Sequence, residues 1–284
     1  MTKRASGARR APTPVARRAA ASASLAVLLV AAPARGGDAG VPPPDPWQDL
    51  ISPDRPGAAN PPTVVGAGVF QVETAFESQT AHPPGAPSAT TLDVPALLRF
   101  GVGHDLEFRL ESNTFRHSSG SSGFADVSVE AKWCPIGGAT GGALAFLPSL
   151  TLPTRTEFSA GMAQASLAAL GGWTLASGTS FALDADAGRV VDDSGNGYEW
   201  RLDTQAACEV PLRRDWAVSG DAFVSDPLQT GADAAWGADA AVEYFPDPDV
   251  QLDVIVSRTF TDPQAATSFQ LGFSWRRRPS RPPR

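Results

Sequence analysis

The chain has 284 residues, 42% of them hydrophobic, with 23 Lys and Arg against 30 Asp and Glu. This length accommodates one large all-β domain or two smaller domains. Six of the bases and none of the acids lie in residues 1–34, which leaves 17 bases against 30 acids, a net charge of −13. A body this acidic argues against nucleic acid as a partner.

Residues 1–34 predict a secretory signal peptide. Basic residues stand at positions 3, 4, 9, 10, 17 and 18, the apolar run Ala19–Ala32 follows, and Ala32-Pro33-Ala34 fits the small-x-small cleavage rule. The run is too short to stay in a membrane as a spanning helix, and its flanks favour the general secretory route. The alternative is a disordered basic arm. The mature chain is therefore expected to be exported.

Beyond the leader, no window contains about 18 consecutive apolar residues, so no transmembrane helix is expected. Residues 35–67 are rich in Pro and Gly and show little periodicity. They predict an extended segment that lies in the periplasm or enters the mouth of the fold as a plug.

The stretch Leu92–Glu111 shows the pattern that the rest of the chain repeats. Between Leu92 and Phe100 every second residue is apolar, and Asp93 and Arg99 fall on the opposite face. After a short turn containing Gly, the residues up to Glu111 alternate in the same way. This pattern predicts an antiparallel hairpin with one apolar and one charged face.

The alternation recurs about twelve times between Gly68 and Trp275, and no charged residue falls on the apolar face of any predicted strand. A charge near the midplane of a bilayer costs about 2–4 kcal/mol for Arg or Lys, so this exclusion is typical of contact with lipid. Short links such as 101–105 and 246–249 alternate with longer links such as 78–89 and 153–163, as periplasmic turns alternate with outer loops. Aromatic residues near the strand ends fit an interfacial girdle.

These patterns predict an all-β fold, a transmembrane antiparallel up-and-down β-barrel of about twelve strands and of the outer-membrane type. The predicted domains are the signal peptide 1–34, the Pro/Gly-rich segment 35–67, the barrel 68–275 and a basic tail 276–284. A soluble lipocalin-like barrel or a β-sandwich is the alternative. A twelve-stranded barrel with an inward apolar face would leave a lumen too wide for side chains to fill.

The charged face of the strands is expected to line the lumen. The candidate lumen-lining residues are Glu73, Arg99, Glu107, Arg109, Asp126, Glu130, Lys132 and Arg201. Acids outnumber bases on the inward faces. One interpretation is a structural network of paired charges, and the other is a pore that prefers cations.

Asp54 and Arg55 lie in the N-terminal segment and are candidates for a plug or gate. Arg55 could dock against the acidic lumen and close the periplasmic mouth. The alternative is a solvated turn.

The sequence offers no catalytic, metal-binding or cofactor-binding site. His82, His104 and His117 stand apart from any cluster with metal-ligand spacing, and no Gly-x-Ser-x-Gly or phosphate-binding loop is present. Cys134 and Cys208 are predicted to lie too far apart on the wall for a disulfide, as free thiols facing lipid or at the rim.

Several stretches occur in an order and spacing that resemble a known family. They are Ser52–Gly57, Gly68–Thr74, Leu97–Gly101, Asp105–Arg109, Asp126–Lys132 and Leu147–Thr154. Together they resemble the outer-membrane family labelled after the meta-cleavage pathway of phenol degradation, often called simply "transporter", over residues 51–275. The chain departs from the family pattern at Ala125, where Gly is expected, and in the nine residues that follow Trp275.

The resemblance implies an outer-membrane barrel that passes small solutes, aromatic or hydrophobic ones among them, with no established cargo. The expected partners are outer-membrane lipid, the barrel-assembly machinery and a small-molecule cargo, in the outer membrane of a bacterial cell. A closed structural or adhesive barrel is the alternative function. An outer-membrane enzyme is a third hypothesis, but no Ser–His pair supports it.

Overall fold

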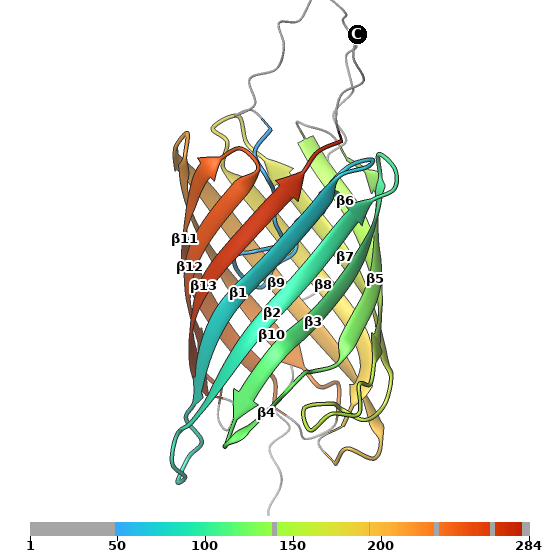
Figure 1. Cartoon of the computed structure of the whole chain (residues 1–284), viewed down its shortest axis with the longest axis vertical. Coiled ribbons are helices and arrows are strands. Elements are labelled where there is room, and N and C mark those ends of the chain that lie inside the picture. Colours follow the sequence, from blue (N-terminus) through green and yellow to red (C-terminus); the bar gives the residue numbers. More distant parts are fainter. Residues whose placement is uncertain (1–48, 138–140, 193, 230–232, 262–264, 280–284) are drawn as a thin grey trace, which may run out of the picture. The chain divides into compact units, whose positions relative to one another are not determined.

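Twelve long antiparallel strands close into a barrel in the computed structural model, which describes residues 49–279 except 138–140, 193, 230–232 and 262–264 (Figure 1). The wall strands are β1 Phe70–Ala81, β2 Ala89–Gly101, β3 Leu106–Ser118, β5 Val127–Ile136, β6 Gly141–Leu152, β7 Gln164–Thr174, β8 Ser180–Val191, β9 Tyr198–Arg213, β10 Trp216–Asp226, β11 Ala235–Asp247, β12 Val250–Thr259 and β13 Ala266–Arg277. The predicted signal peptide lies outside the described residues.

The barrel closes because β1 pairs with both β2 and β13. Val72 lies opposite Leu98 of β2 and opposite Trp275 of β13. Each of the other wall strands also pairs with its two neighbours in the wall, so the described wall has no free sheet edge. The predicted fold class and the count of about twelve strands are confirmed.

The strands extend further than the sequence pattern indicates. Beyond the alternating pattern, Arg116–Ser118 at the end of β3 pair with the short strand β4, Ser121–Gly123. The paired residues are polar or glycine on both faces of the strand, so they show no alternation of apolar and polar side chains that could reveal the pairing.

The two faces of the wall have the polarity expected of a barrel in lipid. In the hairpin β2–β3, Phe100 and Phe108 are 50% and 52% exposed, whereas Arg99 and Glu107 are 1% and 0% exposed. Apolar side chains thus point outward and charged side chains point inward, the reverse of a soluble domain. This arrangement is inconsistent with the lipocalin-like and sandwich alternatives.

The two ends of the barrel differ in their links. The short-turn end carries links 102–105, 175–179, 214–215 and 248–249, and the long-loop end carries links such as 82–88, 153–163 and 192–197. Aromatic pairs lie near both ends: Trp216 and Tyr244 have ring centroids 4.7 Å apart, and Trp236 and Phe260 have centroids 4.5 Å apart. These rings suit the interface between hydrocarbon and water.

Among the residues that the structure describes, no helix is long and apolar enough to cross a membrane.

Val254 tests the lipid-facing assignment, because its outward side chain is 42% exposed near the middle of β12. We expect Val254→Arg to lower the free energy of unfolding by about 2–4 kcal/mol, since the charge must enter the hydrocarbon. Val102→Arg, in a turn at the short-turn end, is the control and should cost about 0–1 kcal/mol. Equilibrium unfolding in lipid vesicles measures both, and equal costs would contradict the assignment.

Candidate functional site

Residues 49–69, the lumen segment, enter the barrel at the short-turn end and run inside it before joining β1 (Figure 1). At the entry, the Ile51 amide donates a hydrogen bond to the carbonyl of Pro248 (2.7 Å), and Ile51 packs against Ala217 and Phe245. At the exit, the Gly68 amide donates to the carbonyl of Gly101 (2.8 Å). Gly101 has to be glycine because a Cβ there would overlap the backbone of Gly66. Both ends of the segment are therefore fixed to the wall.

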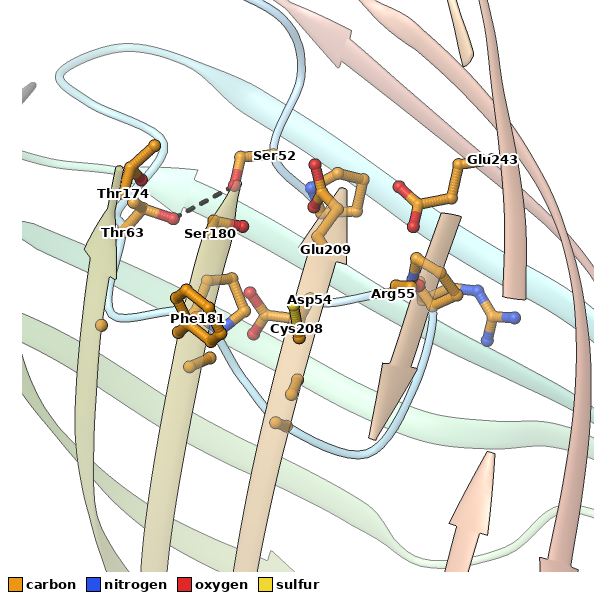
Figure 2. Close-up of a pocket in the computed structure, with 18 of the residues that line it drawn as sticks. Ser52, Asp54, Arg55, Thr63, Thr174, Ser180, Phe181, Cys208, Glu209 and Glu243 are labelled. Carbon is orange, nitrogen blue, oxygen red and sulfur yellow. Dashed lines mark hydrogen bonds between the residues drawn. The ribbon is translucent and has the colours of Figure 1, made fainter. Parts of the chain in front are cut away.

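The lumen contains a cavity on each side of this segment. The first, of about 320 Å³, lies toward the short-turn end and is lined by Arg55, Glu209 and Glu243 among others (Figure 2). The second, of about 280 Å³, lies toward the long-loop end, and of the lumen segment only Asn60 lines it. The segment thus occupies the lumen between two cavities.

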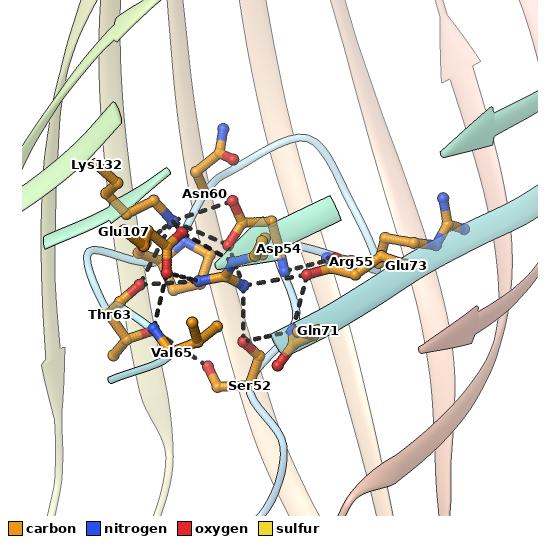
Figure 3. Close-up of polar contacts among 12 residues, drawn as sticks. Ser52, Asp54, Arg55, Asn60, Thr63, Val65, Gln71, Glu73, Glu107 and Lys132 are labelled. Atoms are coloured by element: carbon orange, nitrogen blue, oxygen red, sulfur yellow. Dashed lines mark hydrogen bonds and ion pairs between the residues drawn. The ribbon is translucent and has the colours of Figure 1, made fainter. Parts of the chain in front are cut away.

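Asp54 is the centre of the contact between the segment and the wall (Figure 3). Its carboxylate forms ion pairs with the Nη1 atoms of Arg99 (2.9 Å) and Arg109 (2.7 Å) and with Nζ of Lys132 (3.0 Å). These three cations come from β2, β3 and β5 and are each at most 4% exposed. The register of the wall thereby brings three buried cations together around the carboxylate of Asp54, which belongs to a distant part of the chain.

The ionisation of Asp54 follows from its neighbours. Burial alone raises the pKa of this carboxyl group, but Arg109, Arg99 and Lys132 outweigh burial and hold the pKa below its usual value. Asp54 is therefore a carboxylate at neutral pH.

Two wall glutamates, Glu73 and Glu107, accept hydrogen bonds from the backbone of the segment. Oε2 of Glu73 accepts from the Asp54 amide at 2.9 Å, and Oε2 of Glu107 accepts from the Val65 amide at 2.7 Å. Arg99 lies between them, with Nη1 3.1 Å from Glu73 and Nε 2.9 Å from Glu107. Acids on the two strands that flank β2 thus orient the guanidinium group of Arg99, which pairs with Asp54.

Aspartates on the opposite wall hold the middle of the segment. Asp221 Oδ2 accepts from the Ala58 amide at 2.6 Å, and Asp184 Oδ2 accepts from the Asn60 amide at 2.6 Å. Gly57 has a positive φ, and a Cβ there would overlap the Asp221 carboxylate, so only glycine fits. Together Glu73, Glu107, Asp184 and Asp221 are called the docking carboxylates.

Arg55 contacts the acidic side of the lumen. Its Nη2 atom lies 3.1 Å from Asp253 and 2.9 Å from Oε1 of Gln270. The sequence named Asp54 and Arg55 together as plug or gate candidates, with Arg55 as the docking group. In the structure both residues bind the wall, and Asp54 makes the larger set of ionic contacts.

The other predicted lumen residues lie in different places. Glu130 is buried and pairs with Nε of Arg109 at 3.0 Å. Arg201 pairs with Glu199 at 2.9 Å and does not reach the segment. Asp126 was expected on a strand facing the lumen, but it lies in the loop before β5, which begins only at Val127. Its carboxylate instead accepts from the Thr154 and Ala160 amides and holds the link 153–163.

The basic tail binds the entry of the lumen segment. Nε of Arg276 lies 2.8 Å from Asp249 in the turn before β12, and its Nη2 donates to the carbonyl of Asp49 at 2.7 Å. Arg278 contacts the same two residues. The sequence pattern gave no role to these arginines, since they follow the last predicted strand.

The described residues include no group of three or more His, Cys, Asp and Glu side chains arranged to hold a metal ion. His82 contacts Ser88 and His117 contacts Ser122, both near strand ends. Cys134 and Cys208 are free thiols, and Cys134 packs against an apolar cluster of β6 and β7.

Residues 53–277 match the sequence model of the family described as "Putative MetA-pathway of phenol degradation". No curated protein sequence matches the chain.

Solved structures share the barrel. An outer membrane channel from Pseudomonas putida F1 has a TM-score of 0.57 at 16% identity, covering 75% of this chain and 96% of that one. The NanC porin has a TM-score of 0.55 at 10% identity, covering 72% and 98%. The KdgM porin has a TM-score of 0.50 at 11% identity, with the same coverage. At these identities the likeness shows the fold, which is that of outer-membrane barrels.

Asp54→Asn tests the ionic centre. The amide leaves Arg99, Arg109 and Lys132 short of one anion in a buried site, so we expect the free energy of unfolding to fall by about 3–5 kcal/mol. Residues 49–69 should also become sensitive to proteinase K in detergent-solubilised protein. Asp192→Asn, at a solvated carboxylate in the link that follows β8, is the matched control and should leave protease resistance unchanged. Unchanged resistance of Asp54→Asn would contradict the central role of Asp54.

Proposed function

We propose that the chain, which belongs to the family described as "Putative MetA-pathway of phenol degradation", acts as an outer-membrane channel for small solutes. In this proposal the lumen segment narrows the pore and gates it. The observation that carries the proposal is the docking of residues 49–69 through Asp54, with a cavity on either side.

A channel accounts for the separate segment better than a closed structural barrel does. A ring of twelve strands encloses more space than its own inward side chains fill. A barrel that served only as a scaffold could fill this space with large wall residues. Here a separate segment fills part of it, held by hydrogen bonds from its backbone amides to carboxylates of the wall.

The proposed orientation follows from the links. Short turns of outer-membrane barrels face the periplasm and longer loops face outward. The lumen segment would then enter from the periplasmic side, after export directed by residues 1–34 and insertion by the barrel-assembly machinery.

The proposed cargo is a small solute with an aromatic or hydrophobic part. An apolar patch on the inner wall of β6 and β7 supports this class of solute. The patch is formed by Ala145, Leu147, Ala168 and Leu170. Leu147 and Ala168 line the second cavity, so a solute there would meet apolar side chains beside polar ones.

The surplus of acids supports a preference for cations. The docking carboxylates accept hydrogen bonds from the lumen segment. In the first cavity, Glu243 and Glu209 instead lie opposite Ala217 and Ser219 of β10, so β10 places no cation opposite either carboxylate. Carboxylates that line a pore raise the local concentration of cations.

Deletion of Ile51–Gly57 tests the gate. The deletion removes Asp54 and Arg55, so we expect single-channel conductance in planar bilayers to rise. Deletion of Pro83–Pro87 in the exposed link 82–88 is the control and should leave conductance unchanged. A deletion variant that folds and conducts no better than the parent protein contradicts the gate. A complete lack of conductance in both proteins favours the closed structural barrel instead.

Ion selectivity is a separate test. In planar bilayers with asymmetric KCl, the reversal potential is expected to have the sign of a cation-preferring pore, because both cavities are lined by carboxylates that form no ion pair with another described residue, such as Glu243 and Asp203. The preference should weaken as the salt concentration rises and screens these charges. A reversal potential of the opposite sign would refute the cation preference without affecting the gate.

A further inference from the structure

The second cavity is lined by more carboxyl groups than channel function alone requires. It lies between β3 and β9 on the long-loop side of the lumen segment and measures about 280 Å³, near the lower limit for small-molecule pockets. Five carboxyl groups line it, from Glu111, Glu130, Asp184, Asp186 and Asp203. Arg109 is the one base among its described lining residues.

Arg109 cannot neutralise this set. Its guanidinium group already pairs with Asp54 at 2.7 Å and with Glu130 at 3.0 Å. The carboxyl groups on β8 and β9 therefore face the cavity without a cation from the described lining residues.

Buried acceptors in this cavity also lack donors. Asp184 is 8% exposed, and although its Oδ2 holds Asn60, its Oδ1 has no hydrogen-bond partner. Oδ1 of Asp186 and Oε1 of Gln205 are likewise buried without a partner. An unmet buried acceptor destabilises a fold by about 1–3 kcal/mol, so a ligand that brings donors would relieve a standing penalty.

The register of the wall concentrates these groups. Asp186 lies directly opposite Asp203, and Asp184 lies directly opposite Gln205 on the same pair of strands. Like charges placed opposite each other destabilise a sheet unless a cation lies between or beside them. The four side chains form one cluster on the inner face of β8 and β9.

The wall beside this cluster is apolar. Leu147 and Ala168 contribute to the lining, and both belong to the patch on β6 and β7. A ligand in this cavity would therefore meet carboxylates on one side and aliphatic carbon on the other. A hydrated inorganic cation would use only the first of these surfaces.

We propose that the cavity binds a small organic cation, an ammonium group carried on a compact apolar body. An ammonium group has three donors and a positive charge, which suits the partnerless oxygens of Asp184, Asp186 and Gln205. The apolar body would lie against Leu147 and Ala168. The inference rests on the proposed function, because the solute reaches this cavity through the pore, and it names the class of solute that the channel prefers.

Isothermal titration calorimetry on the full-length protein in detergent tests this proposal, with benzylamine hydrochloride as the probe. Benzyl alcohol has a similar shape without the charge, and benzoate carries the opposite charge. We expect benzylammonium to bind and both comparators to bind at least roughly tenfold more weakly, as the loss of a charged hydrogen bond predicts. Equal binding of benzylammonium and benzyl alcohol would overturn the proposal.

Two variants locate the binding. Asp186→Asn and Asp203→Asn should each weaken benzylammonium binding by roughly tenfold, because each removes a charge from the cluster without removing its bulk. Glu209→Gln is the matched control, since Glu209 lines the first cavity. If the control weakens binding as much as the cluster variants do, the cation binds elsewhere and the assignment fails.

Folding and the nature of the cation are controlled separately. Heat-modifiable migration on gels reports whether each variant is folded. If Asp186→Asn does not fold, Asp186→Glu replaces it as the test, and this variant should retain binding because it keeps the charge. Magnesium chloride that binds with the same dependence on Asp186, while benzylammonium does not bind, would make this an inorganic cation site and refute the proposal.

Conductance of the same preparations separates the two proposals. An open pore that does not bind benzylammonium refutes the cation site alone. Binding without any conductance refutes the channel and leaves the cation site in place.

Discussion

Arg99, Arg109 and Lys132 project from neighbouring strands into the barrel, each at most 4% exposed, and such cations are stable only with anions beside them. The wall supplies Glu73, Glu107 and Glu130, and the lumen segment supplies Asp54. With Asp54 in place the cluster contains four acids and three bases that all make ionic contacts. The position of the whole segment follows from this requirement, because Asp54 can meet all three cations only if the chain runs through the lumen.

The acidity of the chain has a structural explanation in part. Carboxylates of the wall accept hydrogen bonds from backbone amides of the segment, which has no regular secondary structure to satisfy its own donors. An extended chain inside a barrel needs such acceptors, and carboxylates make stronger hydrogen bonds to amides than neutral groups do. The remaining acids line the two cavities, where they set the electrostatic character of the path beside the segment.

Much of the barrel could be predicted because lipid enforces a period of two. The exposed Phe100 and buried Arg99 follow from alternation alone, and the pairing of Arg99 and Arg109 with acids on adjacent strands follows from the inward face that these side chains share. The lumen segment has no period, so the sequence could name Asp54 and Arg55 but could not show that Asp54 meets three cations from strands 45 to 78 residues away. Asp126 was assigned to the strand because the alternation extends back into the loop that precedes β5, which begins only at Val127, and alternation does not mark that boundary.

The same reasoning explains why the tail escaped a sequence-based role. Arg276 and Arg278 follow the last apolar position of β13, Trp275, and their partners Asp49 and Asp249 lie far away in the sequence. Trp275 pairs with Val250, so β13 brings these arginines to the turn at Asp249 only when it is paired with β12. The contact with Asp49 therefore depends on the pairing of β13 with β12. The same two side chains in this way join the turn before β12 to the entry of the lumen segment.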